Sequence, residues 1–265
     1  MPIDITAATL ANSLKPALLP LLNSSLSALS NKFSHWSADA SAEKLARTIT
    51  DINTVKTMWS KDEGLPIDSF YYPAKITKKN QTTEKTIEDL LTEQAVVEGL
   101  VGQGKSILFR HICIHATKAN LIPIFLELRM ISKSQPLESL ILEYLDIIGI
   151  EGGKNTFTHL AKNNKIILIL DGFDEIQSNT IKKAVNDIQS IRKKYTELKI
   201  LISSRPYHEA RGLAGFNVYK LSDLQEKDYD KFLKKLIPDP FKRNNIIEAI
   251  SDAPPKTLRE SLKPP

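Results

Sequence analysis

Apolar residues follow two alternating patterns within residues 91–221. Runs of consecutive apolar residues predict strands buried on both faces, and the segment after each run has apolar residues at helical spacing. The predicted strands cover residues 94–98, 122–128, 165–170, 198–203 and 216–219. The predicted helices between them cover residues 106–119, 137–148, 155–163 and 180–195. This alternation indicates an α/β fold in which a five-stranded parallel sheet lies between two layers of helices.

The preceding part of the chain, residues 1–62, is predicted to form a small helical domain. Leucines at helical spacing mark a first helix, which we expect Pro16 and Pro20 to break or kink. A second amphipathic run extends from Leu45 to Trp59. Such stripes are typical of packing surfaces, and an effector or self-association module is the alternative that spacing alone leaves open.

Two further segments flank the predicted sheet region. Residues 63–90 contain glycine, prolines and a polar, lysine-containing stretch, and we expect a linker with a short extended or hairpin segment and a helix over 87–91. Tyr71 and Tyr72 in this linker are expected to pack between domains, or alternatively to approach a bound base. Residues 222–265 are expected to start a helical domain. Its predicted helices cover residues 228–236 and 241–250.

Composition sets limits on the class of protein. A length of 265 residues with 42% hydrophobic content allows a full buried core. Cys113 is the single cysteine, which excludes an internal disulfide framework and fits a reducing compartment. The leucine-rich run near the N-terminus is interrupted by Lys15, Pro16 and Pro20, and no basic segment precedes it. We therefore expect a cytoplasmic protein with neither a signal peptide nor a membrane span.

The formal net charge of +5 is small and unevenly distributed. Lys and Arg balance Asp and Glu in residues 1–90, exceed them by four in residues 91–220, and exceed them by one in residues 221–265. The surplus lies in the region where an anionic ligand would use it. No basic tail or arm indicates a nucleic-acid site.

One stretch carries the main candidate chemistry: Gly99-Leu100-Val101-Gly102-Gln103-Gly104-Lys105-Ser106. It matches the pattern G-x-x-x-x-G-K-[ST] in full. Glycines allow a tight turn whose N–H groups point at an anion, and a helix that starts near Lys105 adds the positive end of its dipole. Lys105 is expected to reach the β- and γ-phosphates of a nucleotide, and the Ser106 hydroxyl to bind Mg²⁺. A glycine-rich turn that happens to precede Lys-Ser is the alternative.

The pattern requires a strand before the loop and a helix after it, and both are predicted here. Val96 and Val97 are β-branched and precede Gly99. Ile107 begins the apolar positions at helical spacing that follow the loop. We therefore predict a nucleotide-binding site formed by residues 99–107.

The second candidate element is a continuous apolar strand that ends in acidic residues, Ile166 to Glu175. Ligands of open α/β sheets bind at the carboxyl ends of the strands, where these acids are expected to lie. Asp171 is expected to hold Mg²⁺, directly or through water, and Asp174 or Glu175 to orient and deprotonate the attacking water. An ordinary acidic turn after a strand is the alternative.

The third candidate element is the strand and turn from Lys199 to Pro206. Arg205 is expected at the same edge of the sheet, where its guanidinium can contact the γ-phosphate and distinguish a triphosphate from a diphosphate. A surface arginine before a proline is the alternative. Four other polar residues of the region are expected to be packing, surface or solvated strand-end residues: Arg110, His111, Glu127 and Arg129.

With these elements in place, residues 90–235 resemble the NACHT-type members of the STAND class of signalling NTPases. The amino-acid sequences of the motifs are also similar to those of bacterial NACHT proteins of antiphage defence, a form of bacterial innate immunity. The resemblance rests on the loop Gly99 to Ser106, on Asp171-Gly172-Phe173-Asp174-Glu175, on Ser203-Ser204-Arg205-Pro206, on Ile124 to Arg129, and on Val96-Val97-Glu98-Gly99.

The resemblance implies a phosphate-loop (P-loop) NTPase related to AAA+ proteins, with sheet order 2-3-4-1-5. The strand before Arg205 would then lie between the strand before the phosphate loop and the strand of Asp171. The resemblance also implies a switch that ADP holds closed. A trigger ligand of unknown identity, of phage origin if the role is antiphage defence, would allow exchange for ATP, and the ATP form would self-associate. Slow hydrolysis of ATP with Mg²⁺ would serve as a timer.

The C-terminal part departs from the family pattern. Family members usually continue into a helical subdomain with an Asn-Pro-Leu-like turn, a winged helix and a sensor region, whereas residues 251–265 contain no such turn. We therefore expect a fragment or a shortened version of a family member. Two other functions stay open: a nucleotide-dependent assembly scaffold without turnover, and an AAA+-like ATPase that acts on nucleic acid.

Overall fold

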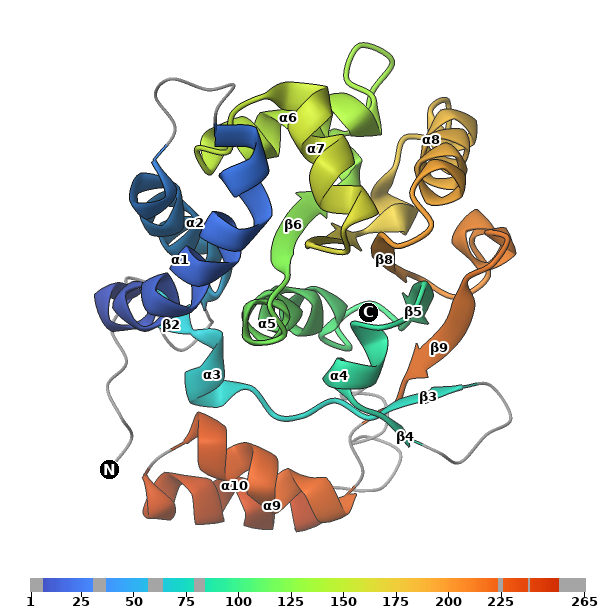
Figure 1. The fold of residues 1–265 in the computed structure, drawn as a ribbon. Helices are drawn as coiled ribbons and strands as arrows, with labels where there is room; N and C mark the ends of the chain where they lie inside the picture. The colour runs from blue at the N-terminus through green and yellow to red at the C-terminus, as the bar shows by residue number, and fades with distance from the viewer. Residues whose placement is uncertain are drawn as a thin grey trace.

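The computed structural model describes residues 7–30, 37–56, 64–78, 84–223, 226–237 and 239–252. A seven-stranded sheet of order β4-β3-β9-β5-β8-β7-β6 forms the centre of the molecule (Figure 1). Its parallel strands are β5 (Ala95–Glu98), β6 (Ile122–Glu127), β7 (Ile166–Asp171), β8 (Lys199–Ser204) and β9 (Asn217–Leu221). Numbered along the chain, these five strands lie in the sheet in the order 2-3-4-1-5, which confirms the predicted α/β class and strand order.

The sheet has two more strands than predicted. Strands β3 (Ile76–Lys78) and β4 (Glu84–Lys85) pair with each other in antiparallel orientation, and β3 also pairs with β9. The expected linker thus contributes an antiparallel extension of the sheet. The reason is that β9 would otherwise be an edge strand with unpaired N–H and C=O groups, and β3 satisfies them.

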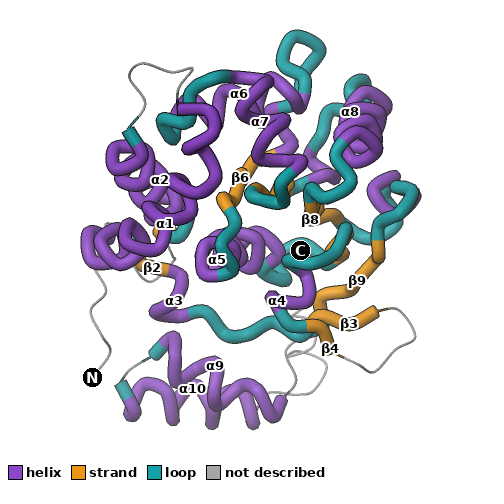
Figure 2. The backbone as a smooth tube through the Cα atoms, in the orientation of Figure 1, coloured by secondary structure: helices purple, strands orange, loops and turns teal. Residues whose placement is uncertain are grey.

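Helices cover both faces of the sheet, as Figures 1 and 2 show. Helix α5 (Lys105–Lys118) lies on one face, with α1 (Ala7–Ser30), α2 (Ala38–Ile52), α3 (Ile67–Phe70) and α4 (Ile87–Leu90) in contact with it. The right-handed connections between parallel strands place the helices that follow β6 and β7 on the opposite face. These helices are α6 (Leu137–Ile147), α7 (Gly153–Lys162) and α8 (Ile181–Lys194).

The remaining elements are short or lie at the C-terminal side. Strands β1 (Thr54–Val55) and β2 (Leu65–Pro66) pair with each other, so the second amphipathic helix ends before Val55, and Trp59 lies outside the described residues. Three short 3-10 helices follow β6, β7 and β8: η1 (Leu128–Met130), η2 (Phe173–Glu175) and η3 (Glu209–Gly212). Helices α9 (Glu226–Leu236) and α10 (Pro240–Asp252) pack together, and α9 contacts α3.

Helix α1 continues through both of its prolines, so the predicted break at Pro16 and Pro20 is wrong, whereas the alternative of a kink stays a prediction. Each proline removes one backbone donor and frees the carbonyl four residues earlier. Both prolines and Asn12 are exposed, and Pro16 is itself four residues before Pro20, so the freed carbonyls lie on the solvent side of the helix. No helix in the described ranges has the length and apolar character needed to cross a membrane.

The N-terminal helices share one hydrophobic core with the sheet. Leu14, Leu18 and Leu22 of α1 are buried in the same cluster as the strand residues Leu168 and Ile169. Two hydrogen bonds add to this packing, because Ser41 Oγ donates to the Gly149 carbonyl over 2.6 Å and Arg110 Nη1 donates to the Ile52 carbonyl over 3.1 Å. The division at residue 62 into separate domains stays a prediction.

Replacement of Leu18 by alanine tests whether this core unfolds as one unit. Leu18 is fully buried, so Leu18→Ala is expected to lower the free energy of unfolding by about 2–5 kcal/mol. Chemical denaturation should show one coincident transition when it is followed by circular dichroism and by the fluorescence of an ATP analogue bound at the loop. The exposed neighbour provides the control, since Ala17→Ser should change stability by less than about 0.5 kcal/mol. A separate transition for the N-terminal helices would contradict the shared core.

Candidate functional site

The loop after β5 has the backbone geometry of an anion cradle. The Gly99 N–H donates to the Ser204 carbonyl over 3.1 Å, which holds the start of the loop against the end of β8. Gly104 has a φ of +85°, which residues with a Cβ rarely adopt, and α5 begins at the next residue. The unpaired N–H groups of the first turn of α5 therefore face the loop, and the helix dipole adds positive potential there.

Lys105 lies across this loop, and within the described residues it has only backbone oxygens as hydrogen-bond partners. Its Nζ donates to the carbonyls of Gly99 over 2.7 Å and of Leu100 over 3.0 Å. Burial lowers the pKa of Lys105 below its usual value, Arg205 lowers it further, and the attraction of Asp174 opposes both effects. A lysine in this state gains from an anionic partner, which neutral carbonyls do not provide.

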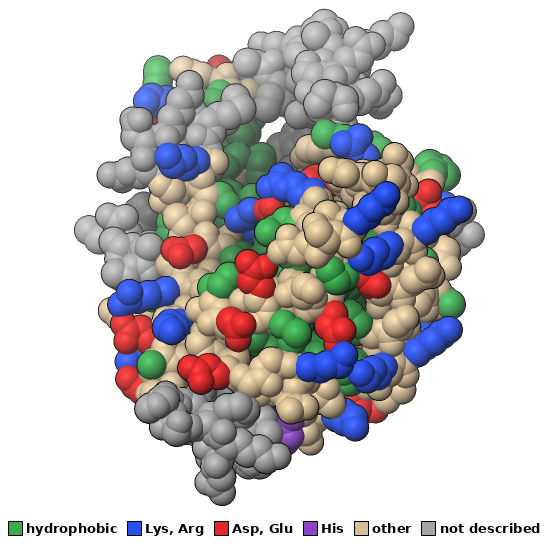
Figure 3. All heavy atoms as spheres, turned by 90° about the horizontal axis from the view of Figure 1, so that it is seen from above, with side chains coloured by type: hydrophobic (Ala, Val, Ile, Leu, Met, Phe, Trp, Pro, Cys, Tyr) green, Lys and Arg blue, Asp and Glu red, His purple; other side chains and the backbone are tan. Residues whose placement is uncertain are grey.

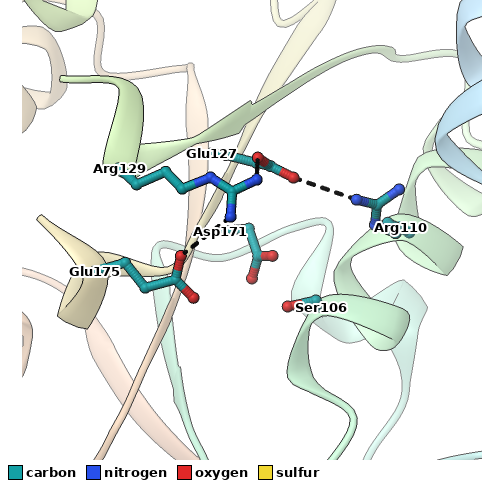
Figure 4. A pocket seen from close by; sticks show the side chains of 6 residues that line it. All are labelled: Ser106, Arg110, Glu127, Arg129, Asp171 and Glu175. Atoms are coloured by element: carbon teal, nitrogen blue, oxygen red, sulfur yellow. Dashed lines mark hydrogen bonds and ion pairs between the residues drawn. The ribbon is translucent and has the colours of Figure 1, made fainter.

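A pocket of about 220 Å³ opens beside the loop. Figure 4 shows that Ser106, at the start of α5, and Asp171, at the end of β7, point toward each other in this pocket. Asp171 is only 7% exposed. Two oxygen side chains that meet in this way are suited to a hard cation such as Mg²⁺, so the residues fit the metal that the sequence predicts. The complete lining consists of Ser106, Arg110, Glu127, Arg129, Asp171 and Glu175.

A hydrogen-bonded chain fixes the orientation of the Asp171 carboxylate. The Ser203 hydroxyl donates to Asp171 Oδ1, and the Gly172 N–H donates to Ser203 Oγ over 2.7 Å. Asp171 and Ser203 belong to neighbouring strands, since β7 pairs with β8. One carboxylate oxygen is thus committed to this chain, and the other remains for the pocket.

Asp174 and Glu175 occupy different environments although they are adjacent in the chain. The side chain of Asp174 is 6% exposed, and Arg205 holds its carboxylate through two groups. The guanidinium Nε of Arg205 lies 2.7 Å from Oδ2, and the backbone N–H of Arg205 donates to Oδ1 over 2.9 Å. Glu175 is 51% exposed, lines the pocket, and lies 3.8 Å from Arg129. The turn between Asp171 and Glu175 depends on Gly172, whose φ is +76° and where a Cβ would lie 3.1 Å from Glu175 Cδ.

The segment after β8 carries two arginines that form ion pairs with acidic residues at or after the strand ends. Arg205 pairs with Asp174, as described, and does not line the pocket of Ser106 and Asp171. Arg211 Nη2 lies 3.6 Å from Glu98 Oε2, and Glu98, at the end of β5, is only 1% exposed. Arg205 nevertheless lowers the pKa of Lys105, whereas Asp174, Asp171 and Glu175 raise it, so all four charges act on this lysine.

Three residues that were expected to be packing, surface or solvated strand-end residues also line the pocket. Arg110, Glu127 and Arg129 line the pocket, where Arg110 Nη2 lies 3.2 Å from Glu127 Oε1 and Arg129 contacts the other oxygen of Glu127 (Figure 4). Glu127 lies opposite Asp171 in the register of β6 and β7. The predicted strand order already made the strands of Glu127 and Asp171 neighbours. The sequence thus contained a signal that Glu127 lies beside Asp171.

The two tyrosines of the expected linker pack against other elements of the described structure, Tyr71 buried and Tyr72 partly exposed. Tyr71 is 8% exposed and its ring lies 4.1 Å from that of His111. The Tyr72 hydroxyl donates to Asp228 Oδ1 over 3.1 Å, and its ring meets Phe232 of α9 edge to face. These contacts are those of the packing alternative.

Positive and negative side chains are interspersed on the face seen in Figure 3. Lys and Arg do not gather there into a continuous basic stripe of the kind that follows a nucleic-acid backbone. This mixed surface agrees with the small net charge of the chain.

Comparison with known proteins identifies one domain. The family model described as NACHT domain matches residues 93–240, which is more than half of the chain. No curated protein matches the chain.

Three of the solved structures that resemble this chain each have low sequence identity with it. AMPPCP-bound DnaA from Aquifex aeolicus is 16% identical with a TM-score of 0.41, and the alignment covers 66% of this chain and 57% of DnaA. A STAND protein with a tetratricopeptide repeat sensor from Pyrococcus horikoshii is 16% identical with a TM-score of 0.41, covering 80% of this chain and 33% of that protein. The ORC1 protein of Aeropyrum pernix in complex with DNA is 17% identical with a TM-score of 0.35, covering 54% and 42%. The chain thus spans only part of these proteins, and similarities of this degree add nothing to the family match.

The lowered pKa of Lys105 predicts that ATP affinity depends on pH. An anion bound at the loop favours the protonated amine, so ATP affinity should fall as pH rises through the pKa of Lys105 in the free protein. Titration of a fluorescent ATP analogue at a series of pH values between about 7 and 10 measures this fall. Lys105→Arg keeps its charge over the whole range and should remove it. An equal fall in the arginine variant would show that Lys105 does not contact the anion.

Proposed function

The chain belongs to the NACHT domain family of P-loop NTPases, and we propose that it is a signalling switch of the STAND class that binds ATP or ADP with Mg²⁺ and slowly hydrolyses ATP. One observation carries the proposal. Ser106 at the start of α5 and Asp171 at the end of β7 line the same pocket, next to a lysine whose only hydrogen-bond partners in the described structure are loop carbonyls. The loop, the lysine and the two oxygen ligands are the parts that a Mg²⁺-nucleotide requires.

The phosphate loop and α5 are proposed to hold the phosphates. N–H groups at the start of α5 donate to phosphate oxygens, and Lys105 exchanges the carbonyls of Gly99 and Leu100 for the β- and γ-phosphates. Ser106 and Asp171 hold Mg²⁺, which supplies positive charge against the phosphate oxygens when it is bound. The hydrogen bond from Ser203 keeps Asp171 oriented toward the ion.

Glu175 is proposed as the residue that orients the attacking water and accepts its proton. It lines the pocket and is half exposed, whereas the carboxylate of Asp174 is buried and already held by Arg205. Asp174 then acts as a positioning residue, because it holds the guanidinium of Arg205 near the edge where the γ-phosphate would lie. Arg205 becomes available to a phosphate only when it leaves or shares its contact with Asp174.

The role of the chain in a cell is proposed from the resemblance of its motifs. We propose a cytoplasmic protein of bacterial antiphage defence whose ATP form self-associates after a trigger ligand allows ADP to leave. The N-terminal helices are the candidates for the signalling output. Added DNA or RNA is expected to leave turnover unchanged, because the sequence has no basic tail or arm and the face seen in Figure 3 has no continuous basic stripe.

Replacement of Lys105 tests nucleotide binding directly. Lys105→Ala removes a charged donor to the phosphates, and ATP affinity should fall on the order of 10- to 100-fold while the fold persists. Isothermal titration calorimetry measures the affinity and circular dichroism the fold. Lys118→Ala provides a matched control, since Lys118 is an exposed lysine at the other end of α5. Equal affinities of wild type and Lys105→Ala would refute the proposed site.

Replacement of the two neighbouring acids separates their roles. Glu175→Gln should lower kcat by about 10²- to 10⁴-fold with little change in ATP affinity, because it removes a general base. Asp174→Asn should lower kcat less, and the effects of Asp174→Asn and Arg205→Ala should not add in the double variant, since the two residues are in contact. Steady-state phosphate release measures both. If the wild-type chain binds ATP but releases no phosphate, the enzymatic part of the proposal is wrong and an assembly scaffold remains.

A further inference from the structure

Two histidines of α5 face each other away from the nucleotide pocket. His111 and His115 are four residues apart, which places them on one side of the helix. Their Nε2 atoms are 3.3 Å apart, whereas their ring centroids are 4.8 Å apart, so the rings meet at their Nε2 edges. His111 is 12% and His115 24% exposed, which leaves the pair accessible from the His115 side.

Each ring has a carboxylate at its other nitrogen. His115 Nδ1 lies 2.8 Å from Glu88 Oε1 of α4, and His111 Nδ1 lies 2.9 Å from Asp68 Oδ1 of α3. The hydrogen bond of His115 Nδ1 with Glu88 favours the ring form of His115 that carries its hydrogen on Nδ1 and leaves the Nε2 lone pair free. This arrangement of carboxylate and imidazole is the one that orients histidine ligands in metal sites. The contact of His111 Nδ1 with Asp68 is close but lacks the geometry of a hydrogen bond.

Two Nε2 atoms 3.3 Å apart repel each other if both carry lone pairs, so a hydrogen or a metal ion must lie between or beside them. A hydrogen that one ring carries on Nε2 and donates to the other is the simplest case, and a metal ion bound by both rings is the other. Metal–nitrogen bonds of about 2.0–2.1 Å at tetrahedral angles place two nitrogen ligands about 3.3–3.4 Å apart. The observed separation therefore equals one edge of a tetrahedral zinc site.

We propose that His111 and His115 bind a transition-metal ion, with Zn²⁺ as the best match, through their Nε2 atoms. Imidazole nitrogens suit Zn²⁺, Cu²⁺ and Ni²⁺, whereas Mg²⁺ prefers oxygen ligands and belongs to the nucleotide pocket. Glu88 orients the His115 ring, and the Asp68 carboxylate lies beside the His111 ring. In the described part of the chain no group of three or more His, Cys, Asp or Glu side chains gathers into a ligand set, so water completes the coordination.

The local charges favour a divalent cation at this place. The two carboxylates contribute two negative charges, and Lys118 contributes one positive charge close enough to affect the titration of Asp68. Tyr71 covers His111 with its ring and carries no charge at neutral pH, because burial raises the pKa of its hydroxyl. The metal would fasten α3 and α4, through their carboxylates, to the helix that starts at the phosphate loop.

The test uses the intact chain without nucleotide. We expect calorimetric titration with ZnCl₂, in an excess of MgCl₂, to show one Zn²⁺ bound per chain, and bound Co²⁺ to give the visible absorption of a site with nitrogen ligands. His115→Gln should abolish both signals. His115 is the more exposed of the two histidines, and thermal unfolding without metal checks that this variant folds.

Two further variants make the test specific. His159→Gln with His208→Gln removes the other two histidines of the described ranges and should leave Zn²⁺ binding unchanged. Glu88→Gln should weaken binding by about 10- to 100-fold without abolishing it, as expected for a residue that orients a ligand. Absence of Zn²⁺ binding to the wild-type chain would show that the pair holds only a proton. Undiminished binding to His115→Gln would place the metal elsewhere. Either result overturns the proposal, and neither bears on the nucleotide site.

Discussion

The parallel pairing of β5, β8, β7 and β6 is the constraint on which the candidate site depends. Their registers bring the carboxyl ends together, with Glu127 opposite Asp171 and Glu98 opposite Ser204. The strands are buried nearly throughout, so polar side chains occur where the strands end. A shift of one residue in β7 would move Asp171 to the other face of the sheet and away from Ser106.

Ion pairs occupy much of the site in the structure. Arg205 holds Asp174, Arg129 lies between Glu127 and Glu175, and Arg110 pairs with Glu127. Lys105, by contrast, has only carbonyl partners among the residues described, and burial lowers its pKa. A polyphosphate with its cation would change these pairings, because it adds negative charge beside the lysine and positive charge beside the acids. Under the proposed function, bound nucleotide would thereby be linked to the segment after β8, which carries both Arg205 and Arg211.

Local patterns were sufficient for the five parallel strands and for the helices between them. The apolar run of Ile166 to Leu170 and the loop of Gly99 to Ser106 each identify their element, and the resemblance of motifs supplied the strand order. Contacts between elements distant in the chain were not available in this way. The pairing of β3 with β9, the continuity of α1 through Pro16 and Pro20, and the pocket position of Arg129 depend on neighbours that a single sequence does not name.

The roles of Ser106 and Asp171 as joint Mg²⁺ ligands are the central claim, and the Mg²⁺ dependence of ATP affinity in Asp171→Asn tests it most directly. Calorimetry of the wild-type chain should show ATP affinity that rises with Mg²⁺ concentration. Asparagine has the size of aspartate and can still accept the Ser203 hydrogen bond, but it lacks the charge that binds the ion. The account predicts that Mg²⁺ no longer strengthens ATP binding by this variant. An undiminished effect of Mg²⁺ would contradict it.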